Sequence, residues 1–141
     1  MKYISKSLAQ TDNIALILAK LLRGGDVIFL RGGLGSGKTA LMKGVAKHLG
    51  IRETVKSPTF VLSKPYRICR PGRSRANRFV HVDAYRLTSA HDLAGIGWGE
   101  IAGQKQTIVA VENPGRMFGR YRPNRTVRLR MLASGHRVIE F

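Results

Sequence analysis

A glycine-rich stretch at residues 32–39 has the residue types and spacing of a phosphate-binding loop. It reads GGLGSGKT, which fits the P-loop pattern of glycine, four residues, glycine, lysine and then serine or threonine. Glycines let backbone amides approach a phosphate closely, the Lys38 ammonium can reach the β- and γ-phosphates, and the Thr39 hydroxyl can ligate Mg²⁺. The stretch therefore predicts a site for a nucleoside triphosphate.

Such a loop needs a strand before it and a helix after it, and the flanking sequence has both patterns. Residues 26–30, DVIFL, form a nearly continuous apolar run that suits a strand buried on both faces of a parallel sheet. Residues 39–49 carry apolar side chains at helical spacing and end at Gly50. Backbone amides then converge on the β-phosphate, and the helix N-terminus adds partial positive charge. This context favours a phosphate site over a flexible glycine turn.

Nucleotide hydrolysis also calls for carboxylates, and the chain has only eight acidic residues. Two of them end apolar runs: Asp83 follows residues 79–82, and Glu112 follows residues 108–111. Ligands of an open α/β sheet bind at the carboxyl ends of its strands. Either carboxylate could hold Mg²⁺ or its waters, or orient the attacking water. The alternative for each is a simple ion pair with one of the many arginines.

The remaining patterns predict a mixed sheet. A helix is expected over residues 11–22, from a capping residue at Thr11-Asp12-Asn13 to a stop at Gly24-Gly25. Residues 64–78, which lie between the strand-like runs at residues 59–62 and 79–82, predict a hairpin-type excursion. We therefore expect an α/β, P-loop NTPase-like three-layer fold with a partly antiparallel central sheet. The β-prone runs besides residues 26–30 are residues 59–62, 79–82, 107–111, 126–132 and 136–141, the last two forming a closing hairpin around Ser134-Gly135.

The composition is strongly basic. The 141 residues include 25 Lys and Arg against 8 Asp and Glu, which gives a net charge of +17 and a pI near 11.3. A hydrophobic content of 43% suffices for a core, so wholesale disorder is excluded and one domain over residues 1–141 is expected. The charge leaves two interpretations open: a solvated basic surface, or a polyanionic partner such as nucleic acid.

Other chemical classes find little support. Cys69 is the single cysteine, so an intramolecular disulfide and a Cys-rich zinc site are excluded. The longest apolar stretch, residues 14–22, is interrupted by Lys20 and is shorter than the roughly 20 residues of a membrane span. We expect a cytoplasmic protein without a membrane partner. The four histidines are scattered, and each is interpreted as a surface or packing residue rather than a metal ligand.

A short GTPase-like pattern, Asp-x-x-Gly, occurs at residues 92–95, but no buried strand precedes it. The Asn-Lys-x-Asp pattern that reads guanine is absent from the sequence. Adenine is therefore the favoured base by default.

Taken in order, four motifs resemble one known family. After the P-loop come SPTF at residues 57–60, HVDAYRL at residues 81–87, and Val111-Glu112. The chain resembles the TsaE family, also called YjeE, the small ATPases of bacterial tRNA threonylcarbamoyladenosine biosynthesis, over nearly its whole length. The resemblance implies a slow, partner-dependent Mg-ATPase. Its implied partners are the TsaD and TsaB proteins, which install threonylcarbamoyl on adenosine 37 of tRNAs reading ANN codons.

The resemblance also implies roles for individual residues, with ATP and Mg²⁺ as cofactors. Glu112 matches the Walker B acid, Asp83 the acid near the metal and γ-phosphate, and residues 57–59 a switch-like segment. The implied catalytic residues are Glu112, Asp83 and Lys38, and the implied metal ligands are Thr39, Glu112 and Asp83. The implied nucleotide contacts are Gly33, Leu34, Gly35, Ser36, Gly37, Lys38, Thr39, Ala40, Ser57 and Thr59.

Three features depart from the family pattern. Gly33 stands where the family usually has an acid, and Asn113-Pro114 stands where it usually has tryptophan after the Walker B glutamate. The charge of +17 is also atypical.

Two other functions remain open. A small metabolite kinase shares the P-loop, and the arginine-rich residues 116–130 could imitate its mobile lid. A nucleic-acid-binding module with a regulatory ATP site would use residues 116–122, where arginines alternate with aromatic residues, for phosphate contacts and base stacking. Contact with tRNA is expected, if at all, through residues 64–78 and 116–130, each with six basic residues and no acid.

Overall fold

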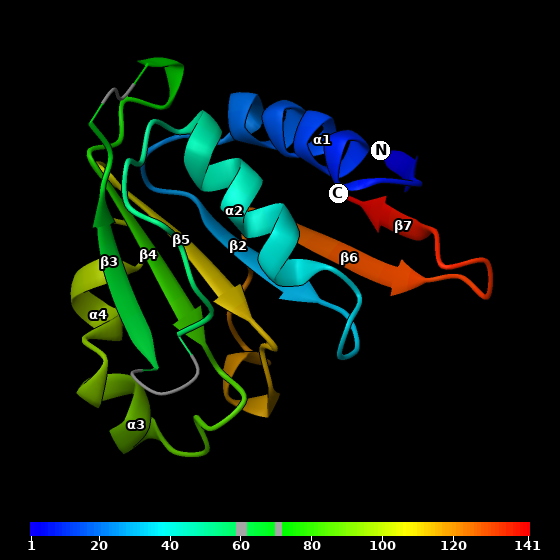
Figure 1. Cartoon of the computed structure of the whole chain (residues 1–141). Helices are drawn as coiled ribbons and strands as arrows, with labels where there is room; N and C mark the ends of the chain where they lie inside the picture. The colour runs from blue at the N-terminus through cyan, green and yellow to red at the C-terminus, as the bar shows by residue number, and fades with distance from the viewer. Residues whose placement is uncertain (59–61, 70–71) are drawn as a thin grey trace.

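The computed structural model describes residues 1–58, 62–69 and 72–141 of the chain. Within these residues one mixed sheet has the strand order β1-β7-β6-β2-β5-β4-β3 (Figure 1). Its strands are β1 (Lys2–Ser5), β2 (Val27–Arg31), β3 (Ser63–Arg67), β4 (Arg78–Asp83), β5 (Thr107–Glu112), β6 (Arg125–Met131) and β7 (Arg137–Glu140).

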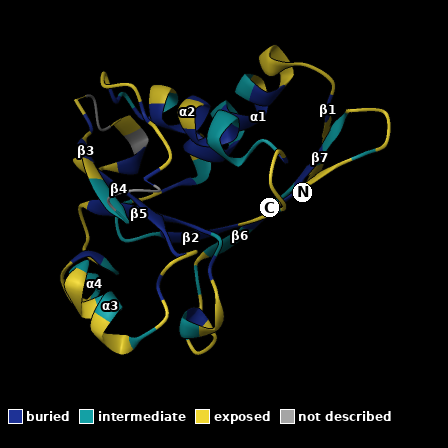
Figure 2. Cartoon of the chain, turned by 60° about the horizontal axis from the view of Figure 1, so that its bottom comes forward, coloured by how far each residue is buried: buried dark blue, intermediate teal, exposed yellow. Residues whose placement is uncertain are grey.

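Two groups of helices cover opposite faces of this sheet and make a three-layer molecule (Figure 2). One face carries α1 (Leu8–Leu21) and α2 (Lys38–His48) over the larger apolar core. The other face carries α3 (Ala90–Gly95), α4 (Trp98–Ile101) and the 3₁₀ turn η2 (Arg116–Phe118) over a smaller core. A second 3₁₀ turn, η1 (Gly72–Ser74), precedes β4.

The central strands are parallel, and their sequences explain why. In β6-β2-β5-β4 each neighbouring pair is parallel, and β5 is buried along its whole length. Continuous apolar runs suit strands that are covered on both faces. The outer strands β3, β7 and β1 pair antiparallel with their neighbours. The predicted α/β fold with a mixed, partly antiparallel sheet is confirmed, as is the closing hairpin.

Two predicted boundaries were wrong or incomplete. Helix α1 begins at Leu8 rather than near Thr11, because Ser7 caps it by accepting a hydrogen bond from the Gln10 amide at 3.2 Å. The strand expected at residues 59–62 falls largely on residues 59–61, outside the described part. The strand next to it, Ser63–Arg67, begins one residue before the predicted hairpin excursion at residues 64–78, and it pairs antiparallel with β4.

Across the described residues, we find no helix with both the length and the apolar character needed to cross a membrane.

Candidate functional site

The P-loop follows β2 directly and leads into α2, as its pattern requires. Gly35 and Gly37 have φ values of 75° and 100°, a left-handed conformation that strains residues with a side chain. Gly32 is constrained differently, since a Cβ there would lie 2.5 Å from the Leu129 carbonyl oxygen and 2.6 Å from Ser36 Oγ. A Cβ on Gly33 would meet nothing within 4 Å. There is therefore space for a side chain at position 33, although this chain has glycine there and not an acid.

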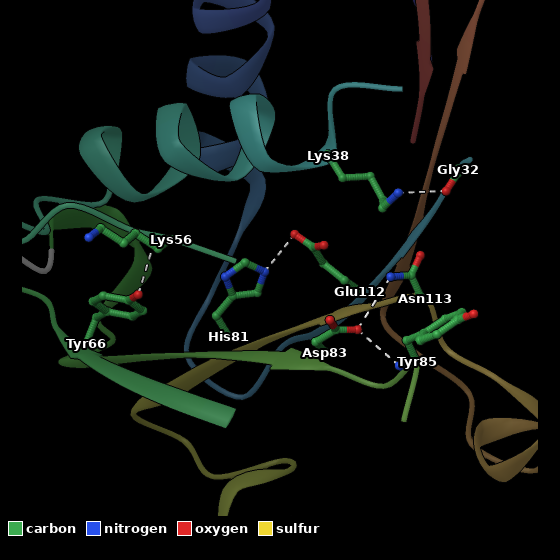
Figure 3. Close-up of polar contacts among 9 residues, drawn as sticks. All are labelled: Gly32, Lys38, Lys56, Tyr66, His81, Asp83, Tyr85, Glu112 and Asn113. Atoms are coloured by element: carbon green, nitrogen blue, oxygen red, sulfur yellow. Dashed lines mark hydrogen bonds and ion pairs between the residues drawn. The ribbon is translucent and has the colours of Figure 1, made fainter. Parts of the chain in front are cut away.

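The polar groups of the loop gather at the start of α2. Lys38 Nζ donates hydrogen bonds to the carbonyl oxygens of Gly32, at 2.7 Å, and Gly33, at 3.1 Å (Figure 3). Ser36 Oγ is buried and has no hydrogen-bond partner in the described structure. The lysine ammonium is thus held at the loop by neutral carbonyls, and the loop interior keeps one uncommitted hydroxyl.

The two predicted carboxylates lie side by side at the ends of neighbouring parallel strands. Asp83 ends β4 and Glu112 ends β5, and the two residues are opposed in register. Asp83 is 6% exposed and Glu112 is 3% exposed. Glu112 Oε1 lies 2.9 Å from Nε2 of His81, which is completely buried (Figure 3). With the Glu112 carboxylate as acceptor, the proton lies on Nε2 of His81.

Asp83 is fixed by two neighbours that face the same opening. Its Oδ1 accepts hydrogen bonds from the Tyr85 amide at 3.0 Å and from Asn113 Nδ2 at 3.4 Å. Asn113 has a φ of 53°, a left-handed conformation that asparagine tolerates better than most residues. Asn113, at the position where the family resemblance would place tryptophan, thus contacts the second carboxylate.

A cavity of about 600 Å³ brings these groups together. Of the residues predicted to form the site, Gly33 and Ala40 are not among those that line it. Tyr85 and Asn113 line it although the site prediction omitted them. The sequence indicated them only by position: Tyr85 lies two residues after Asp83, and Asn113 directly follows Glu112. The predicted residues on the cavity wall are Leu34, Gly35, Ser36, Gly37, Lys38, Thr39, Ser57, Asp83 and Glu112.

The segment expected to act as a switch is described only in part. Ser57 lines the cavity, while Thr59 lies outside the described residues. On the far side of the gap, the Leu62 amide donates to the Pro58 carbonyl at 2.8 Å, and the Leu62 carbonyl accepts from the Asp83 amide at 2.8 Å. The described ends of this segment are therefore attached to each other and to the strand that carries Asp83.

The residues present fit a nucleotide with Mg²⁺. The left-handed glycines form a backbone cradle, and Ser36 Oγ is an unpaired buried group inside it. Within the described residues no cluster of three or more His, Cys, Asp or Glu side chains is built to hold a metal ion. The cavity wall does carry two carboxylates, Asp83 and Glu112. This suits Mg²⁺, which is held by one or two carboxylates together with phosphate oxygens and waters. Thr39, Asp83 and Glu112 would supply the protein ligands.

The GTPase-like pattern at residues 92–95 has a structural role. Asp92 Oδ2 accepts hydrogen bonds from the amides of Thr88, at 2.8 Å, and Ser89, at 3.0 Å. These hydrogen bonds, led by the one from Thr88, lower the pKa of Asp92. Ser89 and Asp92 form a capping box at the start of α3. Asp92 is therefore a helix-capping residue, which agrees with discounting residues 92–95 as a GTPase motif.

The aromatic residues among the arginines at residues 116–122 are core residues. Phe118 is 3% exposed, and its ring packs edge-on against Phe29 and Trp98. The Tyr121 ring packs against the same two side chains, and burial raises the pKa of Tyr121. The packing gives no support to base stacking by these rings, because Phe118 is buried and Tyr121 is partly buried against the core.

Comparison with known proteins agrees with this arrangement of motifs. The model of the family "Threonylcarbamoyl adenosine biosynthesis protein TsaE" matches residues 5–139. The chain belongs to the TsaE family. The matched range includes every element that borders the cavity, from the P-loop to the loop after β5.

Individual TsaE relatives give the same result. The tRNA threonylcarbamoyladenosine biosynthesis protein TsaE of Treponema pallidum is 38% identical over 141 residues, covering 99% of this chain and 98% of that protein. The protein of the same name from Streptomyces coelicolor is 48% identical over 75 residues, 53% of this chain and 48% of that one. The crystal structure of Bacillus subtilis YdiB is similar with a TM-score of 0.70 at 27% identity, covering 99% of this chain and 82% of YdiB.

Proposed function

We propose that this TsaE family member binds ATP with Mg²⁺ in the cavity beside the P-loop and hydrolyses it slowly in support of tRNA threonylcarbamoyladenosine synthesis. Its relatives in Treponema pallidum and Streptomyces coelicolor carry the name of that biosynthesis. The single observation that carries the ATPase proposal is the position of Asp83 and Glu112. They are opposed on adjacent parallel strands and share one cavity with Lys38 and Thr39.

Each group has a distinct task in this mechanism. The amides of the loop and the start of α2 bind the phosphates, and the Lys38 ammonium exchanges its carbonyl partners for phosphate oxygens. The Thr39 hydroxyl and the two carboxylates would hold the metal, which when bound would neutralise charge developing on the phosphates. Glu112 orients the attacking water, and His81 fixes the carboxylate by donating to one of its oxygens.

We propose TsaD and TsaB as the partners on which turnover depends. The entrance to the cavity supports a partner that contacts the nucleotide site directly. Leu34 is fully exposed and Tyr85 is 79% exposed, and both line the cavity. Large apolar side chains in the open often mark protein contacts when they gather at one place.

The test separates binding from turnover. Lys38→Ala is expected to abolish tight ATP binding, because the point charge facing the β- and γ-phosphates is lost. Glu112→Gln is expected to keep ATP binding within a few-fold and to lower hydrolysis by about 100-fold or more, on the scale of other residues that act in the transition state. Binding is measured with a fluorescent ATP analogue and hydrolysis by phosphate release, with and without TsaD and TsaB.

Each failure has a definite meaning. Unchanged turnover in Glu112→Gln would assign the water-orienting role to Asp83 or refute an ATPase at this site. Turnover that rises only with a small-molecule acceptor, with a phosphorylated product, would support the kinase alternative. Of the six arginines that could imitate a kinase lid, Arg125, Arg128 and Arg130 lie on strand β6 of the sheet and so do not belong to a mobile loop.

A further inference from the structure

Part of the sheet face opposite α1 and α2 has no helix over it. Helices α3 and α4 and turn η2 cover this face at β2, β5 and β4, through contacts such as Phe29 with Phe118. Below β7 and β1 no helix is drawn in the described structure (Figure 2). The exposed face of β6, β7 and β1, together with the end of β2, is therefore a surface that the proposed ATPase does not use.

Three arginines lie on the part of this face formed by β6 and the end of β2. Arg31, the residue just before the P-loop, is opposed in register to Arg128. Arg130 lies two residues further along β6 and so points to the same face. All three are exposed, and no acidic partner is found for them among the described residues. They line a cavity of about 340 Å³ whose other walls include Val138 and Glu140.

The pairing of Arg31 with Arg128 on neighbouring strands is electrostatically unfavourable. Like charges directly opposite each other on neighbouring strands destabilise a sheet. Glu140 is opposed to Arg128, but its carboxylate lies 3.6 Å from Lys2 Nζ, so the nearby acid is shared with another cation. A local rule broken without internal compensation is typical of a functional site. The missing compensation is negative charge.

The chemistry favours phosphate groups of a nucleic acid. Guanidinium groups bind phosphate oxygens in a bidentate manner. Arg128 and Arg130 are about 7 Å apart along the strand, comparable with the spacing of neighbouring phosphates. A protein partner fits less well, because the cores of protein interfaces are depleted in charged residues, whereas three arginines gather on this face.

The neighbouring turn η2 extends the same surface and indicates which nucleic acid it suits. Arg116, Arg120 and Arg122 are exposed, whereas the rings of Phe118 and Tyr121 are packed into the core. Exposed arginines without exposed rings suit recognition of a backbone, not stacking on unpaired bases. Double-stranded RNA regions are recognised largely through such shape and phosphate contacts.

We propose that Arg31, Arg128 and Arg130 form a docking face for the phosphate backbone of a folded RNA. This arginine face lies on the side of the sheet opposite α2, and Arg31 joins it to the P-loop through one peptide bond. Residues 64–78 do not belong to it, since β2, β5 and β4 separate β6 from β3. Only residues 116–130 of the two basic stretches therefore contribute.

The test compares two triple variants of the full chain that remove equal charge. One is Arg31→Gln, Arg128→Gln and Arg130→Gln on the arginine face. The matched control, Arg52→Gln, Arg67→Gln and Arg75→Gln, removes three exposed arginines near β3, at the opposite edge of the sheet. The probe is an unmodified tRNA made by transcription, and its affinity is measured by fluorescence anisotropy at several salt concentrations. Thermal melting confirms that both variants fold.

The expected result is a loss of tRNA affinity of about 10-fold or more for the arginine-face variant at low salt, with a salt slope smaller by about two to three. The control should bind within about threefold of the unaltered protein. Equal losses in both variants would refute a specific face and leave bulk charge as the cause. No binding of tRNA by the unaltered protein would also overturn the proposal. Displacement of tRNA by polyglutamate or oligo(U) as efficiently as by unlabelled tRNA would contradict recognition of a folded RNA.

Discussion

At the scale of single residues, His81 gives the Glu112 carboxylate a fixed partner inside the sheet. His81 is opposed to Ala110, so Glu112 is its diagonal neighbour on the same face. The imidazole is completely buried, and its Nδ1 has no hydrogen-bond partner in the described structure. The ring therefore cannot turn to water, and its one hydrogen bond is directed at Glu112.

We predict that His81→Leu slows ATP hydrolysis without a comparable change in KM for ATP. Loss of a hydrogen bond to a buried charged group costs about 1.5–3 kcal/mol, which corresponds to a decrease in kcat of about 10- to 100-fold. His81→Gln keeps a donor and is expected to recover part of the lost rate. Steady-state kinetics with the partner proteins present measure both constants.

The matched control for this prediction is Phe79→Leu, two residues earlier on the same strand and the same face. It changes packing without removing a donor, so kcat should remain close to that of the unaltered protein. If Phe79→Leu and His81→Gln slow the reaction as much as His81→Leu does, His81 contributes packing only.

The chemistry of the site could be predicted from sequence because its signals are local. Lys38 and Thr39 belong to one contiguous motif, and Asp83 and Glu112 each end an apolar run. The contact between His81 and Glu112 depends on how β4 and β5 are aligned with each other. The sequence of one strand alone does not determine that register. The available clue was alternation, since His81 and Asp83 are two residues apart and must share a face.

At the scale of elements, α2 is held against α1 by an unusually close approach at Gly44. A Cβ on Gly44 would lie 2.6 Å from Ala15 Cβ and 3.2 Å from Asp12 Oδ1. Ala15 Cβ is fixed to its backbone, so it cannot move aside alone. Because α2 begins at the P-loop, this contact sets the position of the helix N-terminus that faces the phosphates.

We predict that Gly44→Ala lowers the free energy of unfolding, by up to about 2 kcal/mol. Overpacking typically costs about 1–3 kcal/mol, and the better helix propensity of alanine returns only about 1 kcal/mol. Gly95→Ala in α3 is the control, since a Cβ there meets nothing within 4 Å. Chemical denaturation measures both, and equal or higher stability of Gly44→Ala would show that the helices separate freely.

The same interface predicts a pH effect through Asp12. The hydrogen bond from Lys47 at 3.0 Å is the main cause that lowers the pKa of Asp12 below 3.8, with His48 adding to it. A lowered pKa in the folded state stabilises the protein above the unfolded value and loses this effect as the pH falls through the folded value. Asp12→Asn should therefore cost at most about 1 kcal/mol near neutral pH, because the pair is partly exposed.

This cost should disappear in acid. Unfolding curves of the unaltered protein and Asp12→Asn are compared at pH 7 and at several values below 3.8. A difference that persists unchanged at the lowest pH would contradict the ion-pair origin. Lys47→Met serves as the matched variant, and the double substitution should cost little more than either single one.

The boundaries of elements were less predictable than their existence. For α1 the apolar periodicity starts at Ile14, but the helix starts at Leu8, because Ser7 Oγ accepts from the Gln10 amide in its first turn. The Gln10 side chain in turn accepts from the Lys6 amide just before the helix. The capping signal S-x-x-Q was present but precedes the periodic residues by a full turn and more. Strand β3 includes a proline and charged residues because it is an edge strand, and edge strands lack the apolar run by which β2 and β5 could be recognised.

At the scale of the whole molecule, the charge of +17 opposes folding. The described structure has four contacts between acidic and basic side chains, and two of them involve histidine. Most of the 25 Lys and Arg side chains therefore repel one another through solvent. Arginines opposed in register, such as Arg31 with Arg128 and Arg67 with Arg78, face this repulsion across one pair of strands.

We predict that added salt stabilises this protein, because salt screens repulsion that outweighs attraction. Raising ionic strength from about 0.01 to 0.15 M shortens the Debye length from about 30 to 8 Å, and Tm should rise by several degrees. The variant with glutamine at Arg31, Arg128 and Arg130 should melt at a higher temperature than the unaltered protein in low salt and gain less from added salt. A lower Tm for this variant would mean that the three arginines already have stabilising partners within the chain. No external anion would then be required to explain why they gather on one open face of the sheet.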